Sequence, residues 1–225
     1  MAHYQFPKDM KLDSQPYMIF RAFKWSMRGR KTQDIHSVQK GEDTIVLPIS
    51  TNGVVDSISN NWEEGVGIAD VGLKDVFFRN LVSKVADSIG DLGKYISARR
   101  GFLVNDYAGL AFSGTSFRTF EFSFTLIPKN SDEATTILNL VKAFKRNSLP
   151  EYQEWKILYP NYWNIFIRFP GDREVVKLKN CVMTTFTSNI FDDGVPTIFS
   201  DGTPQKTTLS LGFTELQKLD RRDYA

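Results

Sequence analysis

The sequence contains little of the chemistry on which enzymes most often depend. Its 225 residues include one cysteine, Cys181, and two histidines, His3 and His36. A single cysteine cannot form an internal disulfide, and neither histidine belongs to a metal-binding spacing such as His-Glu-x-x-His. We therefore expect a protein that is not an enzyme, has no cofactor and no metal, and is made in a reducing compartment.

Ligand-binding motifs are also missing or incomplete. Gly65-Val66-Gly67 lacks the rest of a dinucleotide-binding fingerprint, and the Gly-Lys-Ser/Thr sequence of a phosphate-binding loop does not occur. The acidic pairs Glu63-Glu64 and Asp192-Asp193 supply oxygen atoms, but neither has the spacing of a calcium-binding loop. Acidic residues in turns are the commoner explanation of both pairs.

Charge and hydropathy give no sign of a nucleic-acid or membrane surface. The chain has 28 Lys and Arg against 26 Asp and Glu, a formal net charge of +2, so it lacks a concentrated positive field. The short basic run Arg28, Arg30, Lys31 falls in an expected hairpin loop, where charges are commonly solvated. The first twenty residues do not form a signal peptide, and later apolar runs are too short to span a bilayer. We expect a soluble protein with no membrane contact.

Phenylalanine, by contrast, is abundant, with 18 residues. In residues 118–126, Phe120, Phe122, Phe124 and Leu126 alternate with polar residues, which is the period of a strand with one buried face. Similar patterns predict strands at 17–27, 44–49, 163–169, 174–190 and 209–213. The expected fold class is a β-rich α+β protein, organised as a single domain over residues 1–225.

Two segments have the spacing of amphipathic helices. In residues 131–147, Ser131 is the expected N-cap, Asp132 and Glu133 follow as first-turn acids, and the helix should pack on the phenylalanine face of 118–126. Its apolar stripe consists of Ala134, Ile137, Leu138, Val141 and Phe144. The other segment, 73–96, predicts a helical insertion at 66–101, which we expect to contact a neighbouring protein.

Turn residues are concentrated near the C-terminus. Asp192-Asp193-Gly194 and Asp201-Gly202-Thr203-Pro204 interrupt a long hairpin expected from residue 174 to about 216, and the polar tail 218–225 is expected to be loose. Between these turns, apolar residues are mixed with turn residues. The interface candidates are Phe191, Val195, Ile198 and Phe199, which we expect to become ordered only in an assembly.

The order of these elements resembles one protein family. Residues 117–129, FRTFEFSFTLIPK, followed by an acid-opened helix ending in Lys142-Ala143-Phe144-Lys145, are similar to the baseplate tail-tube junction and tube-initiator proteins of contractile-tailed bacteriophages. Each piece alone is strand, turn or cap chemistry; the shared order and spacing over most of 44–215 carry the resemblance. The chain is short for that family. The agreeing pieces are IVLPI at 45–49, NCVMT at 180–184, DGTP at 201–204 and LSLGFTEL at 209–216.

The resemblance implies a tail-tube fold, which is a β-sandwich or barrel-like pair of sheets with a flanking α-helix. It also implies a hexameric ring in the virion that lines a DNA channel and binds neighbouring tail-tube and baseplate hub proteins, with the tape-measure protein and DNA passing through. A heterologous interface explains how one sequence closes such a ring. The alternative is a β-barrel nucleic-acid-binding module, because aromatic strands with basic loops can stack bases. Phenylalanines that alternate as core residues do, without a basic stripe, favour the structural hypothesis.

Overall fold

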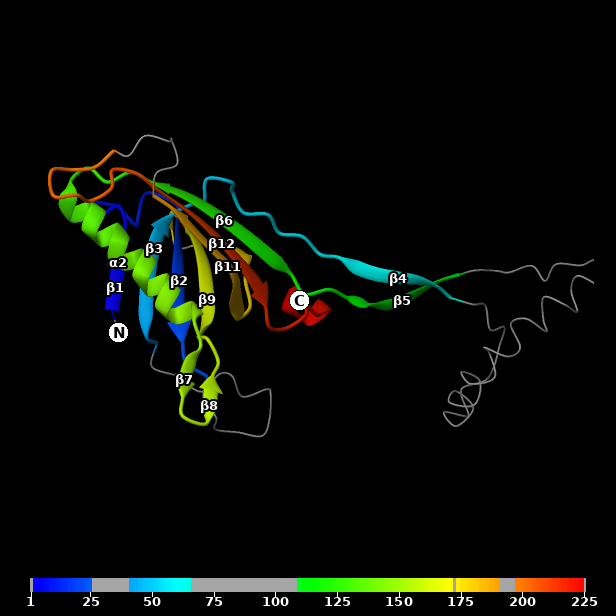
Figure 1. Ribbon diagram of the computed structural model, residues 1–225. Coiled ribbons are helices and arrows are strands. Elements are labelled where there is room, and N and C mark those ends of the chain that lie inside the picture. Colours follow the sequence, from blue (N-terminus) through cyan, green and yellow to red (C-terminus); the bar gives the residue numbers. More distant parts are fainter. Residues whose placement is uncertain (1, 26–40, 66–108, 172, 191–196, 225) are drawn as a thin grey trace, which may run out of the picture. The chain divides into compact units, whose positions relative to one another are not determined.

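The computed structural model describes residues 2–25, 41–65, 109–171, 173–190 and 197–224 (Figure 1). The chain divides into two compact units, which we call the main unit (Met1–Ser59 with Thr115–Ala225) and the inserted unit (Asn60–Gly114). The described part is β-rich α+β, as predicted, with many strands and one α-helix. The expected helical insertion 66–101, with its helix at 73–96, lies outside the described residues.

Eight strands of the main unit form one sheet in the order β1-β3-β2-β9-β11-β12-β6, with β10 paired to β9. β1 runs parallel to β3, whereas β2, β9, β11, β12 and β6 pair antiparallel with their neighbours. The strands predicted at 17–27, 44–49, 118–126, 163–169 and 209–213 are confirmed within the described residues. The strands are β1 (Ala2–Gln5), β2 (Tyr17–Phe23), β3 (Asp43–Pro48), β6 (Thr119–Leu126), β9 (Tyr162–Phe169), β10 (Arg173–Lys177), β11 (Cys181–Asn189) and β12 (Thr207–Glu215).

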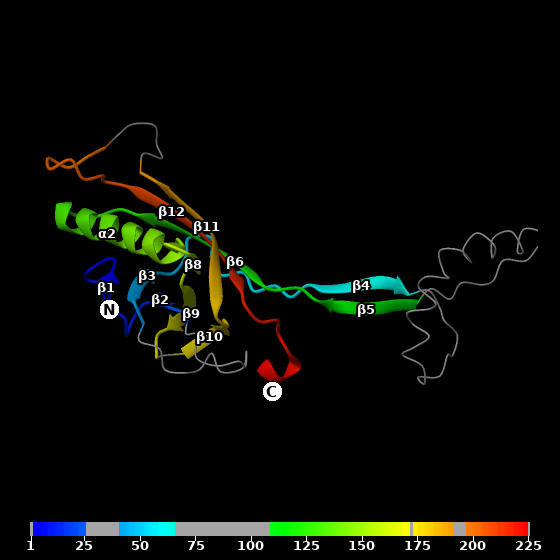
Figure 2. The ribbon, with the colours of Figure 1, turned by 60° about the horizontal axis from the view of Figure 1, so that its bottom comes forward.

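This sheet curls back on itself (Figures 1 and 2). Three strands separate β2 from β6, so the two would lie roughly 19 Å apart in a flat sheet with about 4.8 Å between strands. Yet the ring of Phe20 on β2 lies 6.0 Å from that of Phe122 and 6.1 Å from that of Phe124, both on β6. The Thr51 N–H also donates to the Ser123 carbonyl (2.8 Å), so the chain just after β3 reaches the outer edge of β6. Two halves of one sheet therefore face each other across a shared core.

Helix α2 (Ser131–Ser148) contributes its apolar face to the same core. The Phe144 ring lies 5.5 Å from Phe20, which in turn touches the β6 phenylalanines, so the predicted core shared by helix and strand is confirmed. The helix also contacts β1 and β11. The buried stripe also includes Leu140 and Ala143, which were not predicted to belong to it, whereas Leu138 is only half-buried. No helix of the described residues is both long and apolar enough to cross a membrane.

The N-cap of α2 is Asn130, and the prediction of Ser131 was wrong. The Asn130 backbone is extended, and its side-chain oxygen accepts a hydrogen bond from the Glu133 N–H (2.9 Å). Glu133 accepts in return from the Lys129 N–H (2.8 Å). The Ser131 hydroxyl instead donates to the carboxylate of Asp201, in the turn before β12. The Ser131 hydroxyl, which the local spacing predicted to cap the helix, thus bonds to a residue far away in the chain.

The predicted strand 174–190 is two strands with different partners. β10 pairs with β9, whereas β11 pairs with β12, so the hairpin expected from residue 174 contains only β11 and β12. In the short connection from β10 to β11, the Lys179 N–H donates to the Glu215 carboxylate (2.8 Å), and the Asn180 carbonyl accepts from the Leu216 N–H (2.8 Å). Pro170 and Gly171 lie in the connection from β9 to β10, and Gly171 has a φ of +82°, which favours glycine.

Two smaller hairpins complete the described strands. In the inserted unit, β4 (Asn60–Gly65) pairs with β5 (Gly109–Thr115), and the exposed rings of Trp62 and Phe112 lie 5.3 Å apart. In the main unit, β7 (Glu151–Gln153) pairs with β8 (Lys156–Leu158). The tail that was expected to be loose contains a 3-10 helix, η1 (Arg221–Tyr224), and Asp223 pairs with Lys179 (2.6 Å).

Candidate interaction surface

The predicted interface residues are only partly described. Phe191 and Val195 lie outside the described residues, whereas Ile198 is 52% exposed and Phe199 is half-buried. The Phe199 N–H donates to the Thr203 carbonyl (2.8 Å), and Ile198 bridges to Pro204. The described part of this segment is therefore a closed turn. Its role in an interface stays a prediction.

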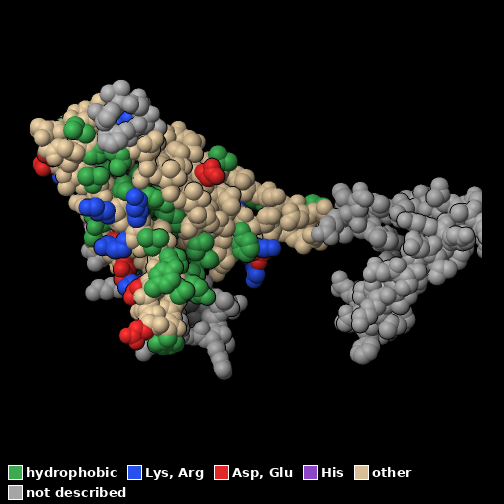
Figure 3. All heavy atoms as spheres, viewed as in Figure 1, with side chains coloured by type: hydrophobic (Ala, Val, Ile, Leu, Met, Phe, Trp, Pro, Cys, Tyr) green, Lys and Arg blue, Asp and Glu red, His purple; other side chains and the backbone are tan. Residues whose placement is uncertain are grey.

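A different segment exposes far more apolar surface. Helix α2 ends at its C-cap Leu149, where Pro150 follows and cannot continue the helix, and the chain then forms the β7–β8 hairpin around Glu154-Trp155. Figure 3 shows hydrophobic side chains gathered where this hairpin protrudes below α2. We call these side chains the aromatic hairpin surface. Its members are Leu149 (65% exposed), Tyr152 (76%), Trp155 (84%), Ile157 (60%) and Tyr159 (77%).

The base of the hairpin is held in place by Trp25, just after β2. The Trp25 Nε1–H donates to the Pro160 carbonyl (2.7 Å). Its ring lies 6.3 Å from that of Tyr159 and 5.3 Å from that of the buried Tyr162, which stacks in turn on Phe23. The aromatic hairpin surface thus stands on a packed base, while its own residues remain exposed.

A hollow of about 280 Å³ lies between this hairpin and the C-terminal end of α2. Two ion pairs line or adjoin it, Lys24 with Glu42 (2.9 Å) and Arg146 with Asp43 (2.5 Å). Burial alone would raise the pKa of the Asp43 carboxyl, but hydrogen bonds from Arg146 and Asn147 outweigh burial, and the pKa is lowered. The charges around the hollow are therefore largely neutralised within the chain. Such a surface suits an apolar partner better than a strongly charged one.

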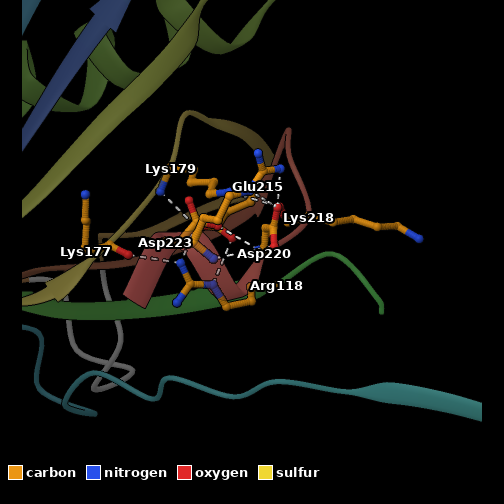
Figure 4. A network of polar contacts seen from close by, with 8 residues as sticks. Arg118, Lys177, Lys179, Glu215, Lys218, Asp220 and Asp223 are labelled. Atoms are coloured by element: carbon orange, nitrogen blue, oxygen red, sulfur yellow. Dashed lines mark hydrogen bonds and ion pairs between the residues drawn. The ribbon is translucent and has the colours of Figure 1, made fainter. Parts of the chain in front are cut away.

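A second polar feature is a buried ion cluster at the start of β6 and the end of β12 (Figure 4). Arg118 makes a two-point contact with Glu215, Nε to Oε2 at 2.8 Å and Nη2 to Oε1 at 2.6 Å, and its Nη1 bonds Asp56 at 2.8 Å. Nη2 also donates to the Lys177 carbonyl (3.0 Å). Both Arg118 and Glu215 are almost fully buried. We call this the Arg118 cluster.

The electrostatics of the Arg118 cluster are those of a structural clamp. Burial alone would lower the pKa of the Arg118 guanidinium, but its bonds to Glu215 and Asp56 outweigh burial and raise the pKa. Nearby, burial and the Glu215 charge raise the pKa of the Cys181 thiol to about 12, so this cysteine is unreactive at neutral pH. Every charged group of the clamp already has a partner, which leaves none for acid–base chemistry.

Sequence reasoning missed both features. Arg118 and Glu215 are the polar ends of strand patterns, and they are 97 residues apart, so local spacing could not pair them. A signal for the hairpin was present, since Tyr152, Trp155 and Tyr159 follow the end of a helix and do not share the alternation of the core strands. Tyrosine and tryptophan are enriched in protein interfaces, because one end of the side chain is apolar and the other can bind water.

The comparisons with other proteins add no assignment. Neither the comparison with protein-family models nor the comparison with curated proteins gives a match for this chain. Across the residues that the structure describes, no group of three or more His, Cys, Asp or Glu side chains could hold a metal ion.

Proposed function

We propose that the chain is a structural subunit of a phage tail baseplate or tail-tube junction, forming a ring that initiates or caps the tail tube and lines the DNA channel. The observation that carries this proposal is the aromatic hairpin surface. Large apolar side chains that gather on the surface of a protein mark interaction sites, and five of them gather here. A protein that works by binding neighbouring copies and tail proteins would use it.

The fold of the main unit supports the finer proposal of a tail-tube-like fold. Two halves of one curled sheet enclose a phenylalanine core, and α2 flanks it, which is the arrangement that the sequence resemblance implies. Among the described residues, no strand pairs with the outer edge of β1 or of β6, and the bonds from Ser50 to Asn52 reach only Glu121 and Ser123 on β6. The unpaired backbone groups of an exposed strand edge promote aggregation of a monomer, but in an assembly they can pair with a strand of the next subunit.

A role that is not enzymatic fits the polar chemistry of the main unit. The buried carboxylates of Glu215 and Asp43 each form an ion pair with an arginine, Arg118 and Arg146 respectively. A catalytic acid or base needs a proton-accepting atom that can reach a substrate. Here those atoms are engaged in holding strands and helix together.

One observation favours the alternative, a nucleic-acid-binding module. The Lys156 ammonium lies 5.2 Å from the centre of the Trp155 ring, and Lys24 and Arg146 lie near the same surface, so cations accompany exposed aromatic rings. Four acids offset these cations, however, and polyanion binding needs a surplus of positive charge. They are Glu42, Asp43, Glu151 and Glu154.

Mass measurement of the purified protein, alone and with neighbouring tail proteins, tests the proposal. We expect closed rings, with six copies as the implied number, measured by native mass spectrometry and sedimentation. Binding of single-stranded DNA should be measured in parallel at low and high salt. Tight, salt-sensitive DNA binding by a monomer that never assembles, with or without partners, would overturn the proposal in favour of the nucleic-acid module.

A further inference from the structure

The described part of the main unit carries a second exposed apolar surface, where the chain departs toward β4 and returns to β6. Here the Ser116 N–H donates to the Ser59 carbonyl (2.9 Å), which joins the two passing segments. We call this the entry surface, and it consists of Val55 (70% exposed), Ile58 (54%) and Phe117 (47%). The backbone of residues 54–58 forms no hydrogen bond with other described residues, so it can still pair with a strand from outside.

The Arg118 cluster holds the entry surface in a fixed position. Asp56, between Val55 and Ile58, is bonded to Arg118, and Phe117 is the neighbour of Arg118 in the chain. Because Arg118 is also bound to Glu215 at the end of β12, the entry surface is tied to the sheet. A prearranged surface loses less conformational entropy on binding than a loose one.

The entry surface and the aromatic hairpin surface are complementary in charge. Glu154 lies at the turn of the hairpin and has no ion-pair partner among the described residues. At the entry surface, the Lys218 ammonium lies 5.4 Å from the centre of the Phe117 ring, and neither it nor that of Lys177 has an ion-pair partner in the described part of the chain. Figure 4 shows both lysine side chains directed away from the Arg118 cluster. The hairpin carries Glu151 and Glu154 against one cation, Lys156, whose ammonium lies 5.2 Å from the centre of the Trp155 ring. It therefore has one acid in excess, and the entry surface supplies the cations.

Within one chain these two surfaces do not cover each other. The hairpin belongs to the connection from α2 to β9, whereas the entry surface lies at the start of β6, and every residue of both is exposed (Figures 1 and 2). Two different complementary surfaces on one chain produce a heterologous contact, which forms a ring when the rotation between copies closes. We propose that the aromatic hairpin surface of one copy docks on the entry surface of the next, with Trp155 against Val55 and Phe117 and with Glu154 beside Lys218.

This inference rests on the proposed function and deepens it by naming the contact between copies. Disulfide crosslinking tests it directly, because the only native cysteine, Cys181, is fully buried and leaves a silent background. We would prepare Trp155→Cys and Val55→Cys and oxidise each alone and in an equal mixture. We expect a crosslinked dimer in the mixture and monomer in each separate sample. The double variant should give a ladder that ends at the ring.

Two outcomes of the crosslinking would overturn the contact. Crosslinked dimer from Trp155→Cys alone would show that two hairpins meet each other around a two-fold axis. Absence of dimer from the mixture, while the wild-type protein assembles, would show that the ring uses other surfaces. The second result would leave the proposed ring standing, whereas a wild-type protein that stays monomeric with its tail partners would remove both proposals.

Charge exchange provides an independent measurement. Glu154→Lys and Lys218→Glu should each weaken assembly about tenfold, since each places like charges opposite one another. Combining both changes should restore most of the wild-type affinity. Lys11→Glu, an exposed charge reversal remote from both surfaces in the sequence, is the matched control and should leave assembly unchanged. Failure of the double variant to recover would contradict the pairing of Glu154 with Lys218.

Discussion

Phe20 lies in a strand and Trp155 in a hairpin turn; both are large aromatic residues, yet their surroundings are opposite. Phe20 is fully buried on β2, and its ring touches those of Phe122, Phe124, Phe144 and Phe213. Trp155, at the turn of the β7–β8 hairpin, is 84% exposed. The same class of side chain therefore serves the core in one region and remains free for a partner in the other.

The difference comes from how the strands are covered. β2 is paired on both sides, by β3 and β9, and its inner face lies under the other half of the curled sheet. β7 and β8 are three residues long, and within the described part of the chain each pairs only with the other. A lone two-stranded ribbon cannot bury its side chains. Aromatic residues in the core should therefore determine stability, and those of the hairpin should determine association.

Removing the central core ring should have the largest effect. Phe20→Ala deletes a ring that four others touch, so we expect a loss of about 3 to 5 kcal/mol in the free energy of unfolding. Phe122→Ala should cost a similar amount and favour insoluble protein. Urea denaturation followed by tryptophan fluorescence measures both. A soluble Phe20→Ala protein with an unchanged midpoint would contradict the shared core.

Breaking the Arg118 cluster should have the next largest effect on the free energy of unfolding. Arg118→Met leaves the buried Glu215 carboxylate without its main partner, and the expected loss is roughly 3 to 5 kcal/mol. Changing both residues, Arg118→Met with Glu215→Leu, should recover much of that loss because no uncompensated charge then remains. The denaturation midpoints of the single and double variants decide this. A double variant no more stable than the single one would show that the pair itself, and not the orphaned charge, matters.

The ion pair between Asp43 and Arg146 should make the stability of the fold depend on pH. Because the folded protein holds the pKa of Asp43 below its ordinary value, the carboxylate stabilises the fold above that ordinary pKa. This contribution is lost as the pH falls through the lowered value. We expect the melting temperature to fall more steeply between about pH 5 and about pH 3 in the wild type than in Asp43→Asn. Parallel curves for the two proteins would contradict this role.

Changing the hairpin should affect stability least. Trp155→Ser removes an exposed ring, so the free energy of unfolding should change by no more than about 0.5 kcal/mol. Assembly measured by sedimentation should nevertheless weaken. A destabilisation as large as that of Phe20→Ala would mean that the hairpin belongs to the core, and the comparison between the two regions would fail.

Much of the fold was predictable because burial leaves a local pattern. The alternation of Phe120, Phe122 and Phe124 and the stripe of 131–147 mark buried faces within a few residues of chain, and both elements formed where predicted. The resemblance to tail-tube proteins depends on the same local patterns. What they do not contain is the partner of each buried face.

Tertiary structure alone decided those partners. The curl that brings Phe20 to β6, the contact of Arg118 with Glu215 and the bond from Ser131 to Asp201 all join residues far apart in the chain. The exposure of Trp155 was equally hidden, since an aromatic residue becomes buried only if another element covers it. The period of a strand is set by its own backbone, whereas pairing order and cover depend on which distant segments lower the free energy of the whole chain together.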